Sequence, residues 1–133
     1  MATSYSFYRN YFASHAQHEL APGPKDFAIV EYLRKYSPLV GNLRDVGCVN
    51  SPLSREIPRA ISVRKYYGVD ILPANEVPDQ VKDIVYAHAD IDEDIPFADK
   101  VFDVIVCSEV IEHLRNPDNV FEFAHENLGN NGI

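Results

Sequence analysis

The apolar positions follow two different patterns, one before and one after about residue 38. In the first part, an aromatic cluster at helical spacing predicts a short helix within residues 3–20. The cluster consists of Tyr5, Phe7, Tyr8, Tyr11 and Phe12. A second helix is predicted from Pro24 to about Ser37, because proline favours the first turn of a helix and apolar residues then recur at every third position.

From Asn42 onward, short apolar runs alternate with helical stretches, which predicts strand–helix–strand units around a parallel sheet. Strands are expected at 43–47, 65–70, 84–89 and 102–107, with helices at 52–62, 75–82 and 119–128. Asp118 is the expected cap of the last helix, and Gly129 its end. The pattern predicts one α/β domain over residues 1–133, with helices in 1–38 and the βαβ units in 39–133.

The composition is that of a folded protein, with 46% hydrophobic and 24% charged residues in a chain of 133. A formal net charge of -8, without a basic cluster, argues against a nucleic-acid partner. No stretch reads as a signal peptide or a membrane span, so a cytoplasmic protein without a membrane partner is expected. Cys48 and Cys107 are then expected to be reduced thiols.

Acidic residues recur where three of the predicted strands end. Asp45 and Gly47 lie at the turn after the first strand, Asp70 ends the second and Asp90 follows the third. A turn that brings backbone close to a nucleotide favours residues without bulk. A carboxylate after the second strand can accept hydrogen bonds from both ribose hydroxyls. These positions predict a nucleotide site at the carboxyl ends of the strands.

The stretch after the fourth strand reads Ser108-Glu109-Val110-Ile111-Glu112-His113-Leu114. With the three acidic strand ends before it, this stretch resembles the ordered motifs of class I S-adenosylmethionine-dependent methyltransferases. The resemblance covers the chain from about Asn42 to its end, and residues 128–133 look like the family's turn into its fifth strand. It implies a three-layer, Rossmann-like α/β fold with a parallel sheet in the order 3-2-1-4, here ending before the fifth strand.

The resemblance also implies S-adenosyl-L-methionine as the cofactor. The positions it assigns to the cofactor are Asp45, Gly47 and Cys48 for the methionine part, Asp70 and Ile71 for the ribose, Asp90 and Ile91 for the adenine, and Ser108 for the methyl-transfer end. It gives Glu109 and His113 as the catalytic candidates, close to that end.

The turn after the first strand departs from the family, because Val49 and Ser51 stand where the family usually has glycine. A β-branched side chain at the point of closest approach would occupy space that the ligand needs, and it resists positive φ angles. Weaker cofactor binding is therefore expected, and Val49→Gly should strengthen it. The alternative is a tight turn in a fold that no longer binds a cofactor.

Glu109, Glu112 and His113 are spaced so that a helix would bring their side chains onto neighbouring faces. They could chelate a cation, as in metal-dependent relatives, or fix the strand-to-helix turn, as in metal-free ones. No metal is expected, since a magnesium site would need further ligands. His113 could act as a general base, although methyl transfer depends chiefly on alignment.

Three functions are compatible with these motifs. The first is methyl transfer from S-adenosylmethionine to an oxygen, nitrogen or carbon nucleophile of a small molecule, by in-line displacement. The second is a non-catalytic, methyltransferase-like binding or scaffold module, which explains Val49 better. The third is a nicotinamide-dependent dehydrogenase, which would need a fuller glycine fingerprint.

The predicted fourth strand has consequences for partners. Residues 101–107 are apolar on both faces, and without a fifth strand they form an edge that can pair with another chain. A homodimer or a partner chain at this edge is expected, and Val104→Lys should weaken that association.

Overall fold

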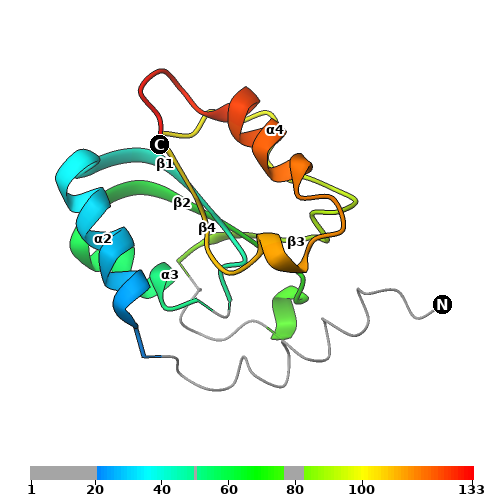
Figure 1. The fold of residues 1–133 in the computed structure, drawn as a ribbon, viewed down its shortest axis with the longest axis horizontal. Coiled ribbons are helices and arrows are strands. Elements are labelled where there is room, and N and C mark those ends of the chain that lie inside the picture. The colour runs from blue at the N-terminus through cyan, green and yellow to red at the C-terminus, as the bar shows by residue number, and fades with distance from the viewer. Residues whose placement is uncertain (1–20, 50, 77–82) are drawn as a thin grey trace.

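The computed structural model of the chain describes residues 21–49, 51–76 and 83–133. Within these residues lies a four-stranded sheet in the order β3-β2-β1-β4, and all its neighbouring pairs are parallel (Figure 1). The strands are β1 (Leu39–Val46), β2 (Ser62–Asp70), β3 (Val85–His88) and β4 (Val104–Cys107). The order expected from the motifs is thereby confirmed.

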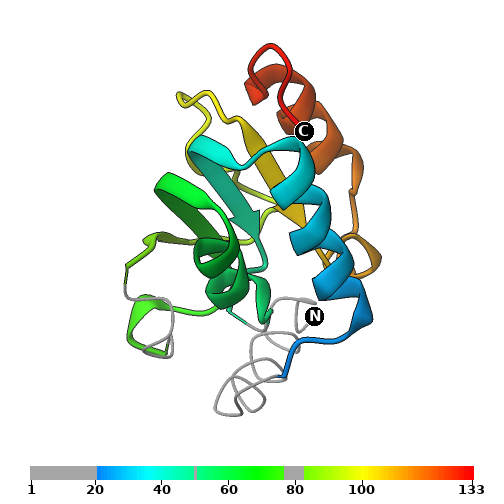
Figure 2. The ribbon, with the colours of Figure 1, turned by 90° about the vertical axis from the view of Figure 1, so that its left-hand side faces the viewer.

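Helices cover both faces of the sheet. They are α2 (Pro24–Tyr36), α3 (Leu53–Ala60) and α4 (Asp118–Asn127), with short 3₁₀ turns η1 (Ala74–Glu76) and η3 (Ile111–His113). Buried residues of α2 and α3 pack against one face, and those of α4 pack against the other, which gives three layers (Figures 1 and 2). None of the helices in the described ranges is long and apolar enough to cross a membrane.

Helix α2 begins as its sequence predicts. Pro24 stands in its first turn, and the Gly23 amide donates to Oδ2 of Asp26 at 2.8 Å, which satisfies one amide at the helix start. Val30 and Leu33 are buried against the sheet, whereas the chain turns away at Ser37 before Pro38. The helix therefore lies beside β4 with one apolar face turned inward (Figure 2).

Alternation along the strands separates two cores. Leu43, Tyr66 and Val104 belong to the core under α2 and α3. The core under α4 centres on Phe102, which is fully buried between Tyr67 and Phe123, with ring centroids 5.5 and 6.0 Å away. Because β1, β2 and β4 contribute side chains to both faces, these three strands are held by packing on two sides.

Several expected boundaries shift. β1 begins at Leu39 and β2 at Ser62, each a few residues before the predicted start, because the two strands already pair there. Phe102 lies outside β4 and forms an isolated parallel bridge with Leu128. Asp118 is the first residue of α4 rather than its cap, which is Pro117.

The helix expected at 75–82 is, where described, only the 3₁₀ turn η1. The helix expected within residues 3–20 lies outside the described residues.

Candidate functional site

The strand order places a topological switch between β1 and β4. From β1 the chain continues to β2 on one side, whereas β4 joins β1 on the other side after β3. In open parallel sheets, ligands bind outside the carboxyl ends of the strands at such a switch. The predicted cofactor residues lie at or just after the carboxyl ends of these strands.

Gly47 forms the turn directly after β1 and has a φ of 76°, a left-handed conformation that glycine adopts without strain. Its amide donates to the Val69 carbonyl of β2 at 2.8 Å. A Cβ atom at this position would lie 2.3 Å from Cγ2 of Val110, in the segment after β4. The Val110 side chain thus occupies the space next to Gly47 that a side chain at this position would need.

Val49 lies in the protein core. Its side chain is 1% exposed and packs with Cys48 and Leu72, while its amide donates to Oδ2 of Asp70 at 2.9 Å. The steric reason for expecting weak cofactor binding is therefore wrong in this structure, because the valine is a core residue.

We expect Val49→Ala to lower the free energy of unfolding by about 1.5 kcal/mol, since each buried carbon group contributes about 0.8 kcal/mol. Urea denaturation measures this change. Val85→Ala, on the exposed side of β3, is the matched control and should change stability by less than about 0.5 kcal/mol. An equal loss in both variants would show that Val49 is not packed as described.

Asp45 is buried in β1, one residue before its end, and is 1% exposed. The Tyr66 hydroxyl donates to its Oδ2 at 2.7 Å. Burial raises the pKa of Asp45 to about 7; the Tyr66 bond opposes this rise and the charge of Asp70 adds to it. Tyr66 was not singled out from the sequence, because a tyrosine within a strand usually indicates only packing.

Asp70 ends β2 and is 8% exposed. Its Oδ2 accepts the Val49 amide and its Oδ1 accepts the Leu72 amide at 3.3 Å. Burial raises the pKa of Asp70, against the lowering effect of these backbone bonds. Together with the Ile71 amide, these backbone donors leave the carboxylate with at least one lone pair that could accept a hydrogen bond from a ligand hydroxyl. Ile71, directly after it, is half-buried.

The acidic loop after β3 is held in place by a buried side chain and by hydrogen bonds to its carboxylates. Ile91 is buried in the cluster with Val46 of β1, and Oδ1 of Asp90 accepts the Asp92 amide at 3.0 Å. The Asp92 carboxylate in turn accepts the amides of Arg115 and Asn116 at 3.0 and 2.9 Å.

Desolvation would raise the pKa of Asp92, but these bonds outweigh it and the pKa lies below its usual value. Asp92 thus holds the loop against the segment before α4, a role that the charge pattern did not reveal.

The two catalytic candidates lie on the segment after Ser108, which is half-buried. Glu109 has a φ of 60°, and its side chain, 63% exposed, pairs with Nζ of Lys25 at 3.0 Å. This lysine lowers the pKa of Glu109. His113 ends η3, with Nε2 at 4.0 Å from a Glu112 carboxylate oxygen.

The expected helical arrangement of the three side chains is therefore wrong, because Glu109 precedes a single 3₁₀ turn. Among the described residues, no group of three or more His, Cys, Asp or Glu side chains is placed to hold a metal ion.

A family model described as a methyltransferase domain matches residues 12–133. No curated protein sequence matches the chain.

Three solved structures share its fold. The N-methyltransferase NodS from Bradyrhizobium japonicum WM9, in complex with S-adenosyl-L-homocysteine, has a TM-score of 0.71 and 17% identity, over 91% of this chain and 67% of its own. An S-adenosylmethionine-dependent methyltransferase from Clostridium acetobutylicum has a TM-score of 0.66 and 15% identity, over 96% and 55%.

The third, from Geobacter sulfurreducens and in complex with S-adenosyl-L-homocysteine, has a TM-score of 0.62 and 14% identity, over 93% and 52%. At these identities the likeness shows the fold. The chain spans 67%, 55% and 52% of the lengths of these three proteins.

Proposed function

Because the chain belongs to the methyltransferase domain family, we propose that it binds S-adenosyl-L-methionine and takes part in methyl transfer to a nucleophile of a small molecule. The observation that carries this proposal is the Gly47 turn at the switch between β1 and β4, with the Asp70 carboxylate at the end of the neighbouring strand β2. Two proteins with this fold were solved with S-adenosyl-L-homocysteine.

The residues at this edge fit such a cofactor. Gly47 offers a turn without a side chain, and a cationic amino-acid group placed beside Asp45 would favour the ionised form of that buried carboxyl. Asp70 has at least one lone pair left for a ribose hydroxyl. Asp90 and Ile91 begin the loop that is tied to the start of α4, where Asn119 Nδ2 donates to the Ile91 carbonyl at 3.5 Å.

The cofactor would supply a methyl group on a sulfonium centre, and the protein would supply alignment with the acceptor. Ser108 would face this end. Glu109 would remain ionised beside Lys25, so it suits positioning better than proton transfer. His113 is the candidate to accept a proton from the acceptor nucleophile.

We expect Asp70→Ala to weaken binding of S-adenosylhomocysteine by about 1.5 to 3 kcal/mol, as for hydrogen bonds to a charged group. Isothermal titration calorimetry measures the affinity. Since Asp70 also accepts the Val49 amide, a thermal melt must show that the variant is folded at the titration temperature. Asp99→Ala, an exposed acid outside the site, is the control and should bind as the parent does. Unchanged affinity in Asp70→Ala would rule out its ribose role.

A non-catalytic binding module is the second candidate, because the Val110 side chain covers Gly47 and both Asp70 oxygens already bond to backbone. Parallel titrations with S-adenosylhomocysteine and NAD separate the candidates. Binding of the first alone supports the methyltransferase, and binding of NAD alone supports a nicotinamide enzyme. Binding of neither supports the module.

A further inference from the structure

Asp45 is a buried carboxyl group beside the Gly47 turn, and it pairs with no cation among the described residues. It is 1% exposed and lies one residue before the end of β1. Its Oδ2 accepts the Tyr66 hydroxyl at 2.7 Å, and this donor is neutral. A carboxylate that is buried without a cation loses its hydration and is not compensated, so the empty site favours the protonated form.

Tyr66 reaches Asp45 because of the register between β1 and β2. Its own register partner is Leu43, two residues before Asp45 and on the same face of the sheet. Directly opposite Asp45 stands Gly68, where a Cβ atom would lie 2.7 Å from Sγ of Cys48. The tyrosine therefore reaches the carboxyl group along one face of the sheet, past a position that has no side chain of its own.

The ionisable groups around Asp45 on the strands are acids and thiols. Burial raises the pKa of Asp45 to about 7, and the negative charge of Asp70 at the end of β2 adds to the rise. Burial also raises the pKa of the Cys48 thiol in the turn and that of the Cys107 thiol on β4, so both thiols are neutral at pH 7. Helix α3, on the same face, carries charged residues that pair with one another, namely Arg55, Glu56 and Arg59.

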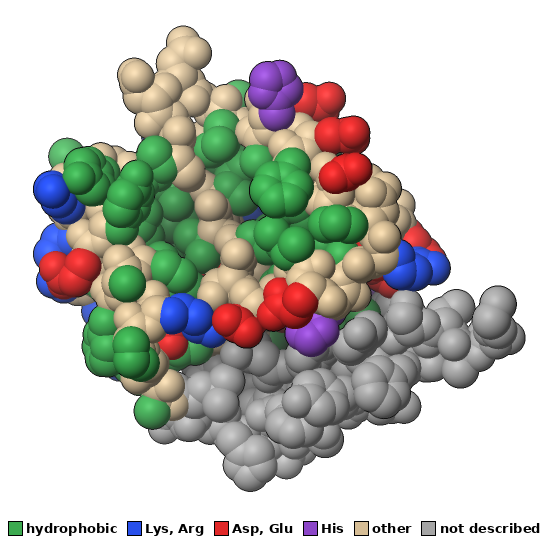
Figure 3. Space-filling model, in the orientation of Figure 1, with side chains coloured by type: hydrophobic (Ala, Val, Ile, Leu, Met, Phe, Trp, Pro, Cys, Tyr) green, Lys and Arg blue, Asp and Glu red, His purple; other side chains and the backbone are tan. Residues whose placement is uncertain are grey.

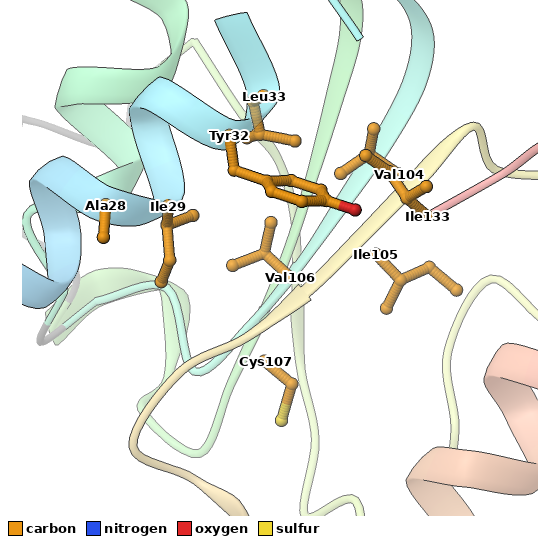
Figure 4. Close-up of a pocket in the computed structure, with 9 residues that line it drawn as sticks. All are labelled: Ala28, Ile29, Tyr32, Leu33, Val104, Ile105, Val106, Cys107 and Ile133. Carbon is orange, nitrogen blue, oxygen red and sulfur yellow. The ribbon is translucent and has the colours of Figure 1, made fainter. Parts of the chain in front are cut away.

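Helix α2 also brings no free cation to this carboxyl group. Figure 4 shows its side chains following β4, with Leu33 near the start of the strand and the earlier Ile29 nearer its end. The first turn of α2 therefore lies near the carboxyl ends of the strands, where Lys25 pairs with Glu109 at 3.0 Å and Asp26 is a further acid. Figure 3 shows acidic, basic and histidine side chains close together at the lower edge of this face.

We propose that Asp45 and Tyr66 bind the ammonium group of the cofactor in exchange for a proton. The Tyr66 hydroxyl holds one carboxylate oxygen, and the ammonium group takes the other and keeps its own three protons, while the Asp45 proton passes to the solvent. Tyr66 is then a positioning residue, since it acts through Asp45. The inference rests on the proposed binding of S-adenosylmethionine, and it adds that protons and cofactor compete for one carboxyl group.

Isothermal titration calorimetry with S-adenosylhomocysteine, in buffers of different ionisation enthalpy, counts the protons released. We expect about one proton at pH 6, where the Asp45 pKa of about 7 leaves this group protonated in the empty site, and about a tenth of a proton at pH 8. The affinity should rise about tenfold between these two conditions.

The matched ligand is 5′-methylthioadenosine. It carries the same ribose toward Asp70 but has no ammonium group, so it should bind without releasing the Asp45 proton. The difference in proton release between the two ligands isolates the ammonium group, and it needs no variant of the protein.

Three variants test the two residues. Asp45→Asn has no proton to release, so its affinity for S-adenosylhomocysteine should not change between pH 6 and 8 and should be at least about tenfold below that of the parent at pH 8. Tyr66→Phe lacks the hydroxyl that opposes the rise in the Asp45 pKa, so the midpoint of the affinity profile should move to higher pH. Tyr67→Phe, a buried tyrosine in the core under α4, is the control and should keep the parent's profile.

Failure of this inference differs from failure of the proposed function. Binding of S-adenosylhomocysteine at pH 6 without proton release, or with the same release as 5′-methylthioadenosine, would overturn the inference and leave cofactor binding in place. No binding at any pH between 6 and 8 would overturn both. If Tyr66→Phe lowers the affinity equally at every pH, Tyr66 has a structural role only and does not position Asp45.

Discussion

Replacing Asp45 with asparagine should make the folded chain about 4 kcal/mol more stable at pH 8, while its stability below pH 4 should hardly change. The carboxyl group is buried beside Tyr66, and burial raises its pKa from 3.8 to about 7. An asparagine keeps an oxygen that can accept the Tyr66 hydroxyl, but it cannot ionise. The variant therefore escapes the cost of a buried charge.

The sign of this pH dependence follows from the number of protons that the folded and unfolded chains bind. Between pH 3.8 and about 7 the folded chain keeps the Asp45 proton that the unfolded chain has released, so stability falls as the pH rises. One pKa unit corresponds to about 1.4 kcal/mol, and the loss is complete above the folded pKa. The gap between parent and variant should widen up to about pH 7 and then level off.

Urea denaturation at about pH 3.5 to 8.5 measures the effect. Asp92→Asn is a control that should lower stability instead of raising it, because the pKa of Asp92 is lowered in the folded chain. Its carboxylate stabilises the fold above its unfolded pKa, and this contribution is lost as the pH falls. Parallel pH profiles for the parent and Asp45→Asn would show that Asp45 is not protonated in the fold.

Gly47→Ala should lower the free energy of unfolding by about 2 to 5 kcal/mol. The left-handed conformation costs an alanine about 1 to 2 kcal/mol, and the φ of Gly47 is 76°. The new Cβ would also meet Cγ2 of Val110 at 2.3 Å, and overpacking of this kind typically costs about 1 to 3 kcal/mol. Thermal and urea unfolding measure the sum.

A double-mutant cycle with Val110→Ala separates the two causes. If the Val110 side chain is the obstacle, Gly47→Ala should cost less in the Val110→Ala background, where only the backbone strain remains. If the cost is the same in both backgrounds, the contact with Val110 contributes nothing. A Gly47→Ala chain as stable as the parent would contradict the conformation of the turn.

The sheet order could be predicted because the apolar runs and acidic strand ends follow each other as in the methyltransferase family that the sequence resembles. The turn after β1 was harder to predict. The position of Val49 in the motif suggested that its side chain faces the cofactor. In the structure the side chain packs with Cys48 and Leu72, and the sequence alone does not contain this contact. The prediction of a helix after β4 was wrong for a related reason. The residue spacing there is helical, but Glu109 has a positive φ and its side chain pairs with Lys25.

Arg44 and Asp92 illustrate what a linear pattern leaves out. Arg44 interrupts an apolar strand, but nothing in the sequence indicates that its Nε and Nη1 atoms are buried without a hydrogen-bond partner among the described residues. Asp92 belongs to a run of acids that looks uniformly solvated, and its two backbone bonds come from residues more than twenty positions later. Both roles depend on distant segments.

The central position of β1 affects how the chain folds. Its contacts with β2 join residues that are close in sequence, as in the Tyr66–Asp45 bond between residues 21 apart. Its contacts with β4 must wait for distant residues, since Asn42 and Asp103 are 61 apart. Closing the longer loop costs more entropy, so β1 and β2 should form first and β4 should dock late. Until then, one side of β1 remains an open edge, and folding is exposed to aggregation during this interval.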